Sequence, residues 1–148
     1  MRSLRDFEAR SDIVARVAAL SPSSPRRWGR LEFSQMLCHI ADQLRMAMGD
    51  IPTTPPKGAM SLTPMRYLLI HVLPWPRGRA NGPPEAFTTT PAGWEADRDT
   101  VIDLIERFAR TSDSGLAPQH PIFGRLSPHD WSVLSYRHLD HHLRQFSA

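Results

Sequence analysis

One segment near the C-terminus, residues 127–146, constrains the structure of this chain more than any other. Ser127 suits a helix N-cap, Pro128 suits the first helical position, and Asp130 completes a Ser-x-x-Asp capping box. At about 100° per residue, one face of the resulting helix combines apolar side chains with two histidines. The residues on this face are Trp131, Leu134, Ser135, His138, Leu139, His142 and Phe146. The segment therefore predicts a capped helix whose core face carries imidazoles.

His138 and His142 are four residues apart, which is about 6 Å along a helix axis. Two imidazoles at this spacing can bind one metal ion at about 2.0–2.1 Å each. The alternative is a pair of core polar groups satisfied by water or by each other, because an unpaired buried group costs about 1–3 kcal/mol. His141 lies near the edge of the same face and is expected to orient a ligand or to be an alternative ligand. Arg137 is expected to face solvent.

Three other long segments show apolar residues at spacings of three and four, which is typical of helices. They cover about residues 3–20, 33–48 and 92–110, and the first has its stripe at Leu4, Phe7, Val14, Val17 and Ala18. Residues 50–91 contain nine prolines, which break helices and strand ladders, and only residues 62–73 could form a short helix there. We expect an all-α four-helix bundle with a long proline-rich crossover that carries a short extra helix.

A catalytic zinc-type site usually has three protein ligands and one open position. His39 is the only histidine in the other long helical segments, and it lies beside the apolar stripe of residues 36–48. His39 is therefore the candidate third ligand, with His71 of the short crossover helix as the runner-up. A hydrogen-bonded residue in a helix groove is the alternative for His39. Cys38 is expected to be an inert, packed thiol.

Composition limits the class of protein. A length of 148 residues predicts a single domain over residues 1–148. No apolar run approaches the length of about 18 residues that a membrane span needs, and the N-terminus lacks the apolar core of a signal peptide. One cysteine cannot form an internal disulfide, which fits a reducing cytoplasm. The net charge of +3 is mild and the arginines are scattered, which disfavours nucleic-acid binding.

Two stretches carry a resemblance to a known group of proteins. Residues 28–39 read Trp-Gly-Arg-Leu-Glu-Phe-Ser-Gln-Met-Leu-Cys-His. Residues 120–127 read His-Pro-Ile-Phe-Gly-Arg-Leu-Ser and lead into residues 138–146, His-Leu-Asp-His-His-Leu-Arg-Gln-Phe. Together they resemble the DinB/YfiT-like superfamily of metalloenzymes, and within it a branch of unknown function with a C-terminal His-x-x-His-His helix.

This resemblance implies a four-helix bundle that holds a divalent ion with three histidines. His39 would supply one ligand from the second helix, and His138 and His142 would supply two from the last. The superfamily includes thiol-dependent transferases that use bacillithiol, mycothiol or glutathione, and a maleylpyruvate isomerase. Homodimers recur in it, so the resemblance also implies a homodimer.

We therefore expect a metal-dependent enzyme that acts on a small molecule, either a thiol S-transferase or a related isomerase or lyase. Zinc, nickel or iron would suit three histidines, and His141 or Gln145 would orient a ligand by hydrogen bonding. The first alternative is a non-catalytic metal-binding bundle, a stress-response or interaction module, whose site is closed by His141 or His71. The second is a hydrolase that uses a metal-bound water.

Overall fold

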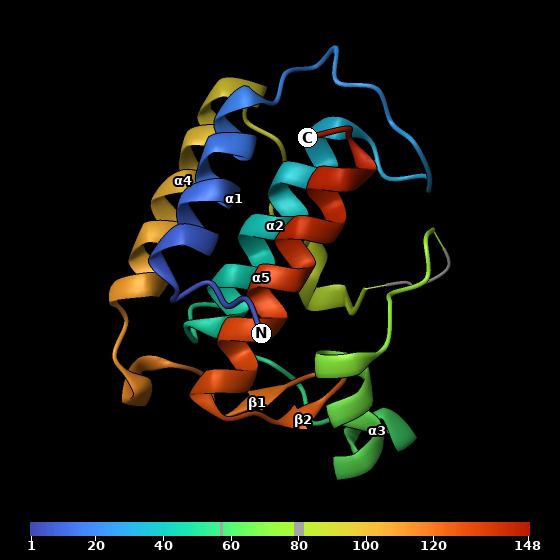
Figure 1. Ribbon diagram of the computed structural model, residues 1–148, viewed down its shortest axis with the longest axis vertical. Helices are drawn as coiled ribbons and strands as arrows, with labels where there is room; N and C mark the ends of the chain where they lie inside the picture. The colour runs from blue at the N-terminus through green and yellow to red at the C-terminus, as the bar shows by residue number, and fades with distance from the viewer. Residues whose placement is uncertain (57, 79–81) are drawn as a thin grey trace.

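The computed structural model describes residues 1–56, 58–78 and 82–148, and this part of the chain is mostly helical (Figure 1). Its α-helices are α1 (Phe7–Ala19), α2 (Phe33–Ala47), α3 (Thr63–Tyr67), α4 (Trp94–Arg110) and α5 (Pro128–Gln145). A π-helical turn spans Leu68–Val72, and 3₁₀ turns span Ala59–Ser61, Pro84–Phe87 and Asp113–Gly115. Two short strands, β1 (Gln119–His120) and β2 (Gly124–Arg125), pair antiparallel.

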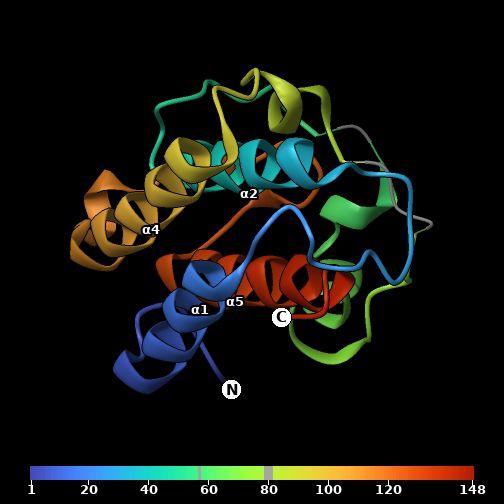
Figure 2. The same ribbon diagram turned by 90° about the horizontal axis from the view of Figure 1, so that it is seen from above.

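The four long helices surround one apolar core. Figure 2 shows α2 and α4 in one layer and α1 and α5 in the other. Helix α2 packs against α4 and α5, and α1 packs against the same two helices, so the core is enclosed between the layers. Leu37, Ile105, Phe108, Trp131 and Leu139 are fully buried there. The expected helical class is thus confirmed, while the DinB/YfiT-like type of bundle stays a prediction.

The N-terminal helix differs from its expected form. Helix α1 begins at Phe7 instead of near residue 3, because residues 4 and 5 form a turn that docks on α5. The Leu4 amide donates to the Ser132 carbonyl at 3.0 Å, and the Leu4 side chain is fully buried. Phe7, expected on the core face, is 74% exposed. The buried face of α1 consists instead of Ala9, Ile13 and Val17.

The start of α5 confirms the predicted capping box. The Asp130 amide donates to the Ser127 hydroxyl oxygen at 3.1 Å, and the Ser127 amide donates to the Asp130 carboxylate at 3.1 Å. His71 Nε2 lies 2.8 Å from the other carboxylate oxygen of Asp130. The cap therefore also attaches the crossover to α5.

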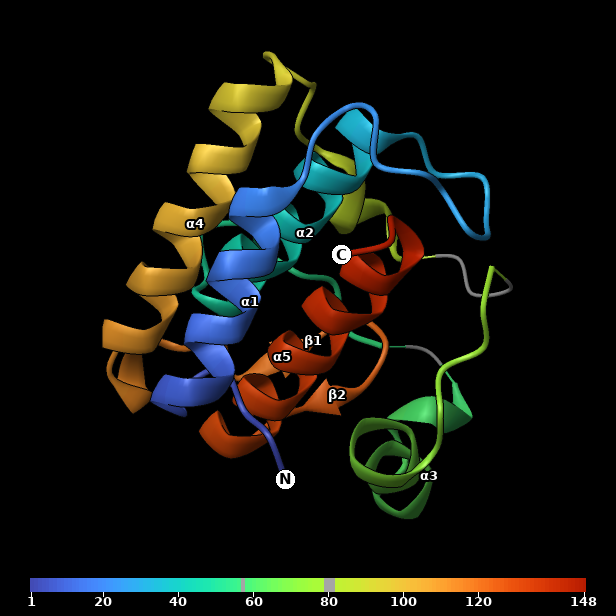
Figure 3. The ribbon, with the colours of Figure 1, turned by 45° about the horizontal axis from the view of Figure 1, so that its top comes forward.

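The crossover helix lies beside α5 (Figure 3). α3 and the π-helical turn form the short helix expected for residues 62–73. The Arg137 guanidinium donates to the backbone carbonyls of Leu69, Ile70 and Leu73, which have no partners within a helix that ends there. The expectation that Arg137 faces solvent is wrong, because these carbonyls need donors and Arg137 supplies them.

None of the helices in the described part of the chain is long and apolar enough to cross a membrane.

Replacing Ser127 with alanine should lower the free energy of unfolding by about 1 kcal/mol, because α5 loses its N-cap. Urea denaturation monitored by circular dichroism measures this change. Ser11→Ala is the matched control, since Ser11 is exposed within α1 and alanine is the better helix former. Equal stability of the Ser127→Ala and Ser11→Ala variants would contradict the capping role.

Candidate metal centre

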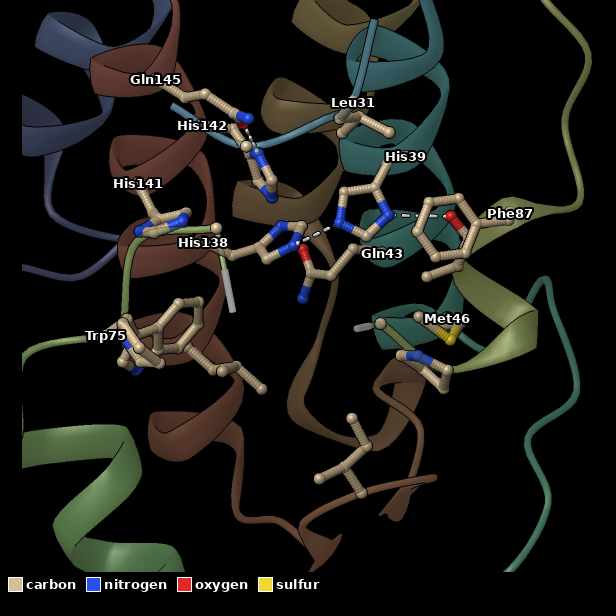
Figure 4. Close-up of a pocket in the computed structure, with 18 of the residues that line it drawn as sticks. Leu31, His39, Gln43, Met46, Trp75, Phe87, His138, His141, His142 and Gln145 are labelled. Atoms are coloured by element: carbon tan, nitrogen blue, oxygen red, sulfur yellow. Dashed lines mark hydrogen bonds between the residues drawn. The ribbon is translucent and has the colours of Figure 1, made fainter. Parts of the chain in front are cut away.

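Three histidine side chains meet between α2 and α5 (Figure 4). His39 comes from α2, and His138 and His142 come from α5. One ring nitrogen of each lies within 4.8 Å of the other two, and each ring centroid is 4.7 or 4.8 Å from the next. The structure thus brings together the three residues that the sequence analysis proposed as metal ligands.

A backbone carbonyl fixes the proton of His39. Nδ1 of His39 lies 2.9 Å from the Ala86 carbonyl oxygen, which can only accept a hydrogen bond. Nδ1 therefore carries the hydrogen, and Nε2 of the neutral ring is the acceptor nitrogen. Phe87 stacks on the ring at a centroid distance of 4.6 Å and holds its orientation. The lone pair of Nε2 points toward His138 and His142.

Two consecutive hydrogen bonds fix the proton of His142 on Nδ1 in the same way. The Gln145 amide nitrogen donates to the Trp28 carbonyl at 2.8 Å, so the amide oxygen of Gln145 must face the other way. That oxygen lies 2.8 Å from Nδ1 of His142 and accepts its hydrogen. Gly29 leaves room for Gln145, because a Cβ on Gly29 would lie 2.6 Å from the Gln145 amide nitrogen. Nε2 of His142 is consequently a free acceptor as well.

His138 completes the cluster. Its Nε2 lies 2.9 Å from Nε2 of His39, while its Nδ1 is buried without a partner among the described residues. The described residues satisfy only one nitrogen of this ring. A cation between the three Nε2 atoms would be bound by three lone pairs, with two of the rings already fixed in the tautomer that binding needs. The donor set fits a divalent metal ion.

Burial keeps the three imidazoles neutral. Burial lowers the pKa of His39, and it lowers the pKa of His142 to about 3. Burial and the neighbouring imidazoles lower the pKa of His138 well below its ordinary value. At neutral pH all three rings therefore offer lone pairs, which is the state that metal binding requires.

A buried carboxylate supports the His39 side of the site. Asp42 is fully buried on α2 and accepts hydrogen bonds from the backbone amides and hydroxyls of Thr88 and Thr89. Burial alone would raise the pKa of Asp42, but these hydrogen bonds outweigh it and hold the pKa below its ordinary value. Because Thr88 follows Phe87, Asp42 also fixes the turn whose Ala86 carbonyl orients His39.

The three histidines border a cavity of about 940 Å³. Its described walls are mainly apolar and aromatic, with Trp75, Phe87, Phe123 and Leu134 among them. Arg30 is the only charged side chain, apart from the histidines, among the described residues of the wall. A small molecule could therefore reach the cluster through a largely apolar space.

Other residues named in the sequence analysis lie outside the converging set. His141 lines the cavity with its ring centroid 5.2 Å from that of His142, but its nitrogens do not join the three others. His71 pairs with Asp130 instead. Cys38 is buried, and burial raises the pKa of its thiol to about 11, in agreement with an inert side chain.

Sequence reasoning did not find Asp42, Ala86 or the Trp28 carbonyl. An aspartate three residues after His39 in a largely apolar segment was a usable signal, since a buried carboxylate must find donors. The backbone carbonyls left no signal, because any residue type supplies one.

Comparison with known proteins identifies one family, whose function is unknown. The profile of one family, described as a protein of unknown function (DUF1569), matches residues 1–148. No curated protein and no solved structure matches the chain significantly.

Replacing Gln145 with methionine should weaken metal binding about 10- to 100-fold, because His142 loses the acceptor that fixes its tautomer. Competition with a chromophoric chelator measures the dissociation constant. Gln145→Glu keeps an oxygen that can accept from His142 and should bind metal more tightly than Gln145→Met. An unchanged affinity in a well-folded Gln145→Met variant would show that the hydrogen bonds of Gln145 do not contribute to binding.

Proposed function

The chain belongs to the DUF1569 family, whose function is unknown, and we propose that it is an enzyme that depends on a divalent metal ion. His39, His138 and His142 are the ligands. The reaction is the transfer of a low-molecular-weight thiol to a small electrophile, or a related isomerisation or elimination. Zinc, nickel and iron all suit three neutral imidazoles.

One observation carries the proposal: three imidazole nitrogens converge at the wall of a cavity, and hydrogen bonds at Nδ1 make Nε2 the acceptor nitrogen in two of the rings. In a purely structural set of core histidines, each acceptor nitrogen would be expected to have a donor in the protein. Here Nδ1 of His142 is bonded to Gln145, and its acceptor Nε2 has no donor among the described residues. Metal binding accounts for the convergence of the rings.

The open side of the cluster favours chemistry over a structural role. Structural zinc sites are closed by four protein ligands, whereas catalytic sites keep one position for substrate or water. Among the described residues, the converging set contains three donors, and the cavity adjoins it. His71, on the crossover, is paired with Asp130 of α5 and is therefore not a fourth ligand that would close the site.

The thiol must come from outside the protein. Cys38 is buried and its raised pKa keeps it protonated at neutral pH. A bound divalent ion would lower the pKa of a thiol or a water, so that the nucleophile is ionised near pH 7. The apolar walls, Trp75 and Phe87 among them, would hold the electrophile and exclude water. Mycothiol, glutathione and bacillithiol are the candidate thiols that the resemblance to DinB/YfiT-like proteins implies.

The first experiment is elemental analysis of untagged protein after reconstitution with zinc, nickel or iron. Wild-type protein should hold about one ion per chain, because three neutral imidazoles bind a divalent ion tightly. His142→Ala should lose most of the metal. His129→Ala is the matched control, because His129 is an exposed histidine on the same helix and should leave the metal content unchanged.

Wild-type protein without metal after reconstitution would overturn the proposal. Equal metal loss in His129→Ala and His142→Ala would indicate unspecific binding by histidines and would overturn it as well.

The second experiment tests thiol transfer in the metal-loaded protein. Each of glutathione, mycothiol and bacillithiol is incubated with a chromophoric aryl halide, and formation of the thioether is followed. The S–H and C–halogen bonds break, the S–C bond forms, and halide leaves with the electron pair while the proton goes to water. Thioether formation should require metal and disappear in His142→Ala.

A second arm uses a chromophoric ester without thiol. Ester hydrolysis without any thiol dependence would replace the transferase with the metal-water hydrolase. Inactivity in both arms, with one ion bound, would favour the structural metal site. The homodimer and the cytoplasmic location remain predictions.

A further inference from the structure

His120 is a buried histidine that the proposed metal site does not use. It ends β1 and is only 5% exposed. Its Nδ1 accepts hydrogen bonds from the backbone amides of Ile122 at 3.0 Å and Phe123 at 3.3 Å. Backbone amides can only donate, so Nδ1 carries no hydrogen. The hydrogen of the neutral ring is therefore fixed on Nε2.

That hydrogen has no acceptor in the described part of the protein. The rings next to His120 are aromatic, with centroids of Phe123 at 4.9 Å and Trp131 at 5.3 Å. Burial lowers the pKa of His120 to about 4, against the opposing effect of the Glu85 carboxylate, so the ring stays neutral. An imidazole N–H without an acceptor among the described residues is available to donate to a molecule in the cavity. His120 lines the same cavity as the three histidines.

The position of His120 along the cavity can be estimated from the rise per residue of α2 and of α5. On α2, Gln43 and Met46 follow His39 along the cavity (Figure 4), and Met46 lies about 10 Å beyond His39 at 1.5 Å per residue. The segment before β1 reaches the far end of this row, because the Ala117 amide donates to the Ala47 carbonyl at 2.8 Å.

Helix α5 gives the same result. The His120 ring contacts Trp131, which precedes His138 by seven residues, and this again corresponds to about 10 Å. The cavity therefore has a polar group at each end, and the walls between them are mainly apolar apart from Gln43. One end is the three-histidine cluster, and the other is the Nε2–H group of His120.

The charged side chains around the cavity indicate which kind of ligand group would accept the hydrogen of His120. Arg30 follows Gly29, which contacts Gln145 and so lies at the end with the three histidines. Glu85 lies near His120, and its negative charge would repel an anionic group there. A neutral oxygen is the acceptor that suits His120.

We propose that His120 recognises the ligand by donating its Nε2–H to a neutral acceptor oxygen, a carbonyl, ether or hydroxyl, at the far end of an aromatic or alkyl molecule about 10 Å long. The other end of that molecule lies at the three-histidine cluster. Only this second statement rests on the proposed metal-dependent function. His120 thus sets the polarity of the substrate that the cavity accepts.

The test compares two probes that differ only in the acceptor. 4-Biphenylhydroxamic acid and its 4′-acetyl derivative share a metal-binding hydroxamate and an aromatic body, and only the second has a carbonyl at the far end. Calorimetry on the zinc-loaded protein should show about fivefold tighter binding of the acetyl probe, as one neutral hydrogen bond provides.

His120→Asn is the matched variant. The asparagine side-chain oxygen can accept from the Ile122 and Phe123 amides in place of Nδ1, so the turn is kept while the donor in the cavity is removed. In this variant the two probes should bind with about equal affinity, so the ratio of their dissociation constants should fall to about one. An equal preference in both proteins, or no binding of either probe to zinc-loaded protein, would overturn the proposal.

Two further measurements separate this inference from the metal site. The ratio of the two affinities in metal-free protein tests His120 alone, whereas zinc content tests the three-histidine cluster alone. Long-range ¹H–¹⁵N spectra of the free protein should show the hydrogen of His120 on Nε2, and the acetyl probe should shift that nitrogen more than the parent probe. An Nδ1–H tautomer of His120 would overturn the inference even if the protein binds zinc.

Discussion

The placement of protons on buried imidazoles is the constraint on which the centre of this protein depends. A buried imidazole cannot keep a charge cheaply, and when neutral it has one donor and one acceptor nitrogen, each of which needs a partner. In His39 and His142 the donor nitrogen is satisfied by an oxygen outside the cluster, at Ala86 and Gln145. The acceptor nitrogens are left facing one another and His138. Lone pairs gathered in this way are stabilised by a cation, which is why the arrangement favours a metal.

The oxygens that set these protons come from segments far apart in the sequence. Asp42 on α2 holds the turn that contains Ala86, so one face of α2 carries both His39 and the anchor for the carbonyl that orients it. On the other side the Trp28 carbonyl, before α2, holds Gln145 at the end of α5. The orientations of the His39 and His142 rings therefore depend on how firmly two loops are attached to the helices. Loss of either attachment would let one ring rotate without changing any of the three histidines.

The sequence predicted which histidines converge better than it predicted their surroundings. His138 and His142 could be found because a helix converts a spacing of four residues into a shared face, and the cap at Ser127 fixed where that helix begins. The stripe predicted for residues 3–20 was wrong at Phe7 but correct at Leu4, because both fit a helical spacing and only the docking of Leu4 on α5 decides between them. The carbonyl partners could not be predicted, since they depend on loop paths that side-chain patterns do not encode.

Histidine provides a hydrogen-bond acceptor at one end of the cavity and a hydrogen-bond donor at the other end. At His39 the backbone offers a carbonyl to Nδ1, which places the hydrogen there and leaves Nε2 as an acceptor. At His120 the backbone offers amides to Nδ1, which leaves Nε2 as a donor. The backbone around each ring, and not the side chain, therefore decides whether Nε2 offers a lone pair or a hydrogen to the cavity. A ligand that spans both ends must match this order, with its metal-binding group at one end and its neutral oxygen at the other.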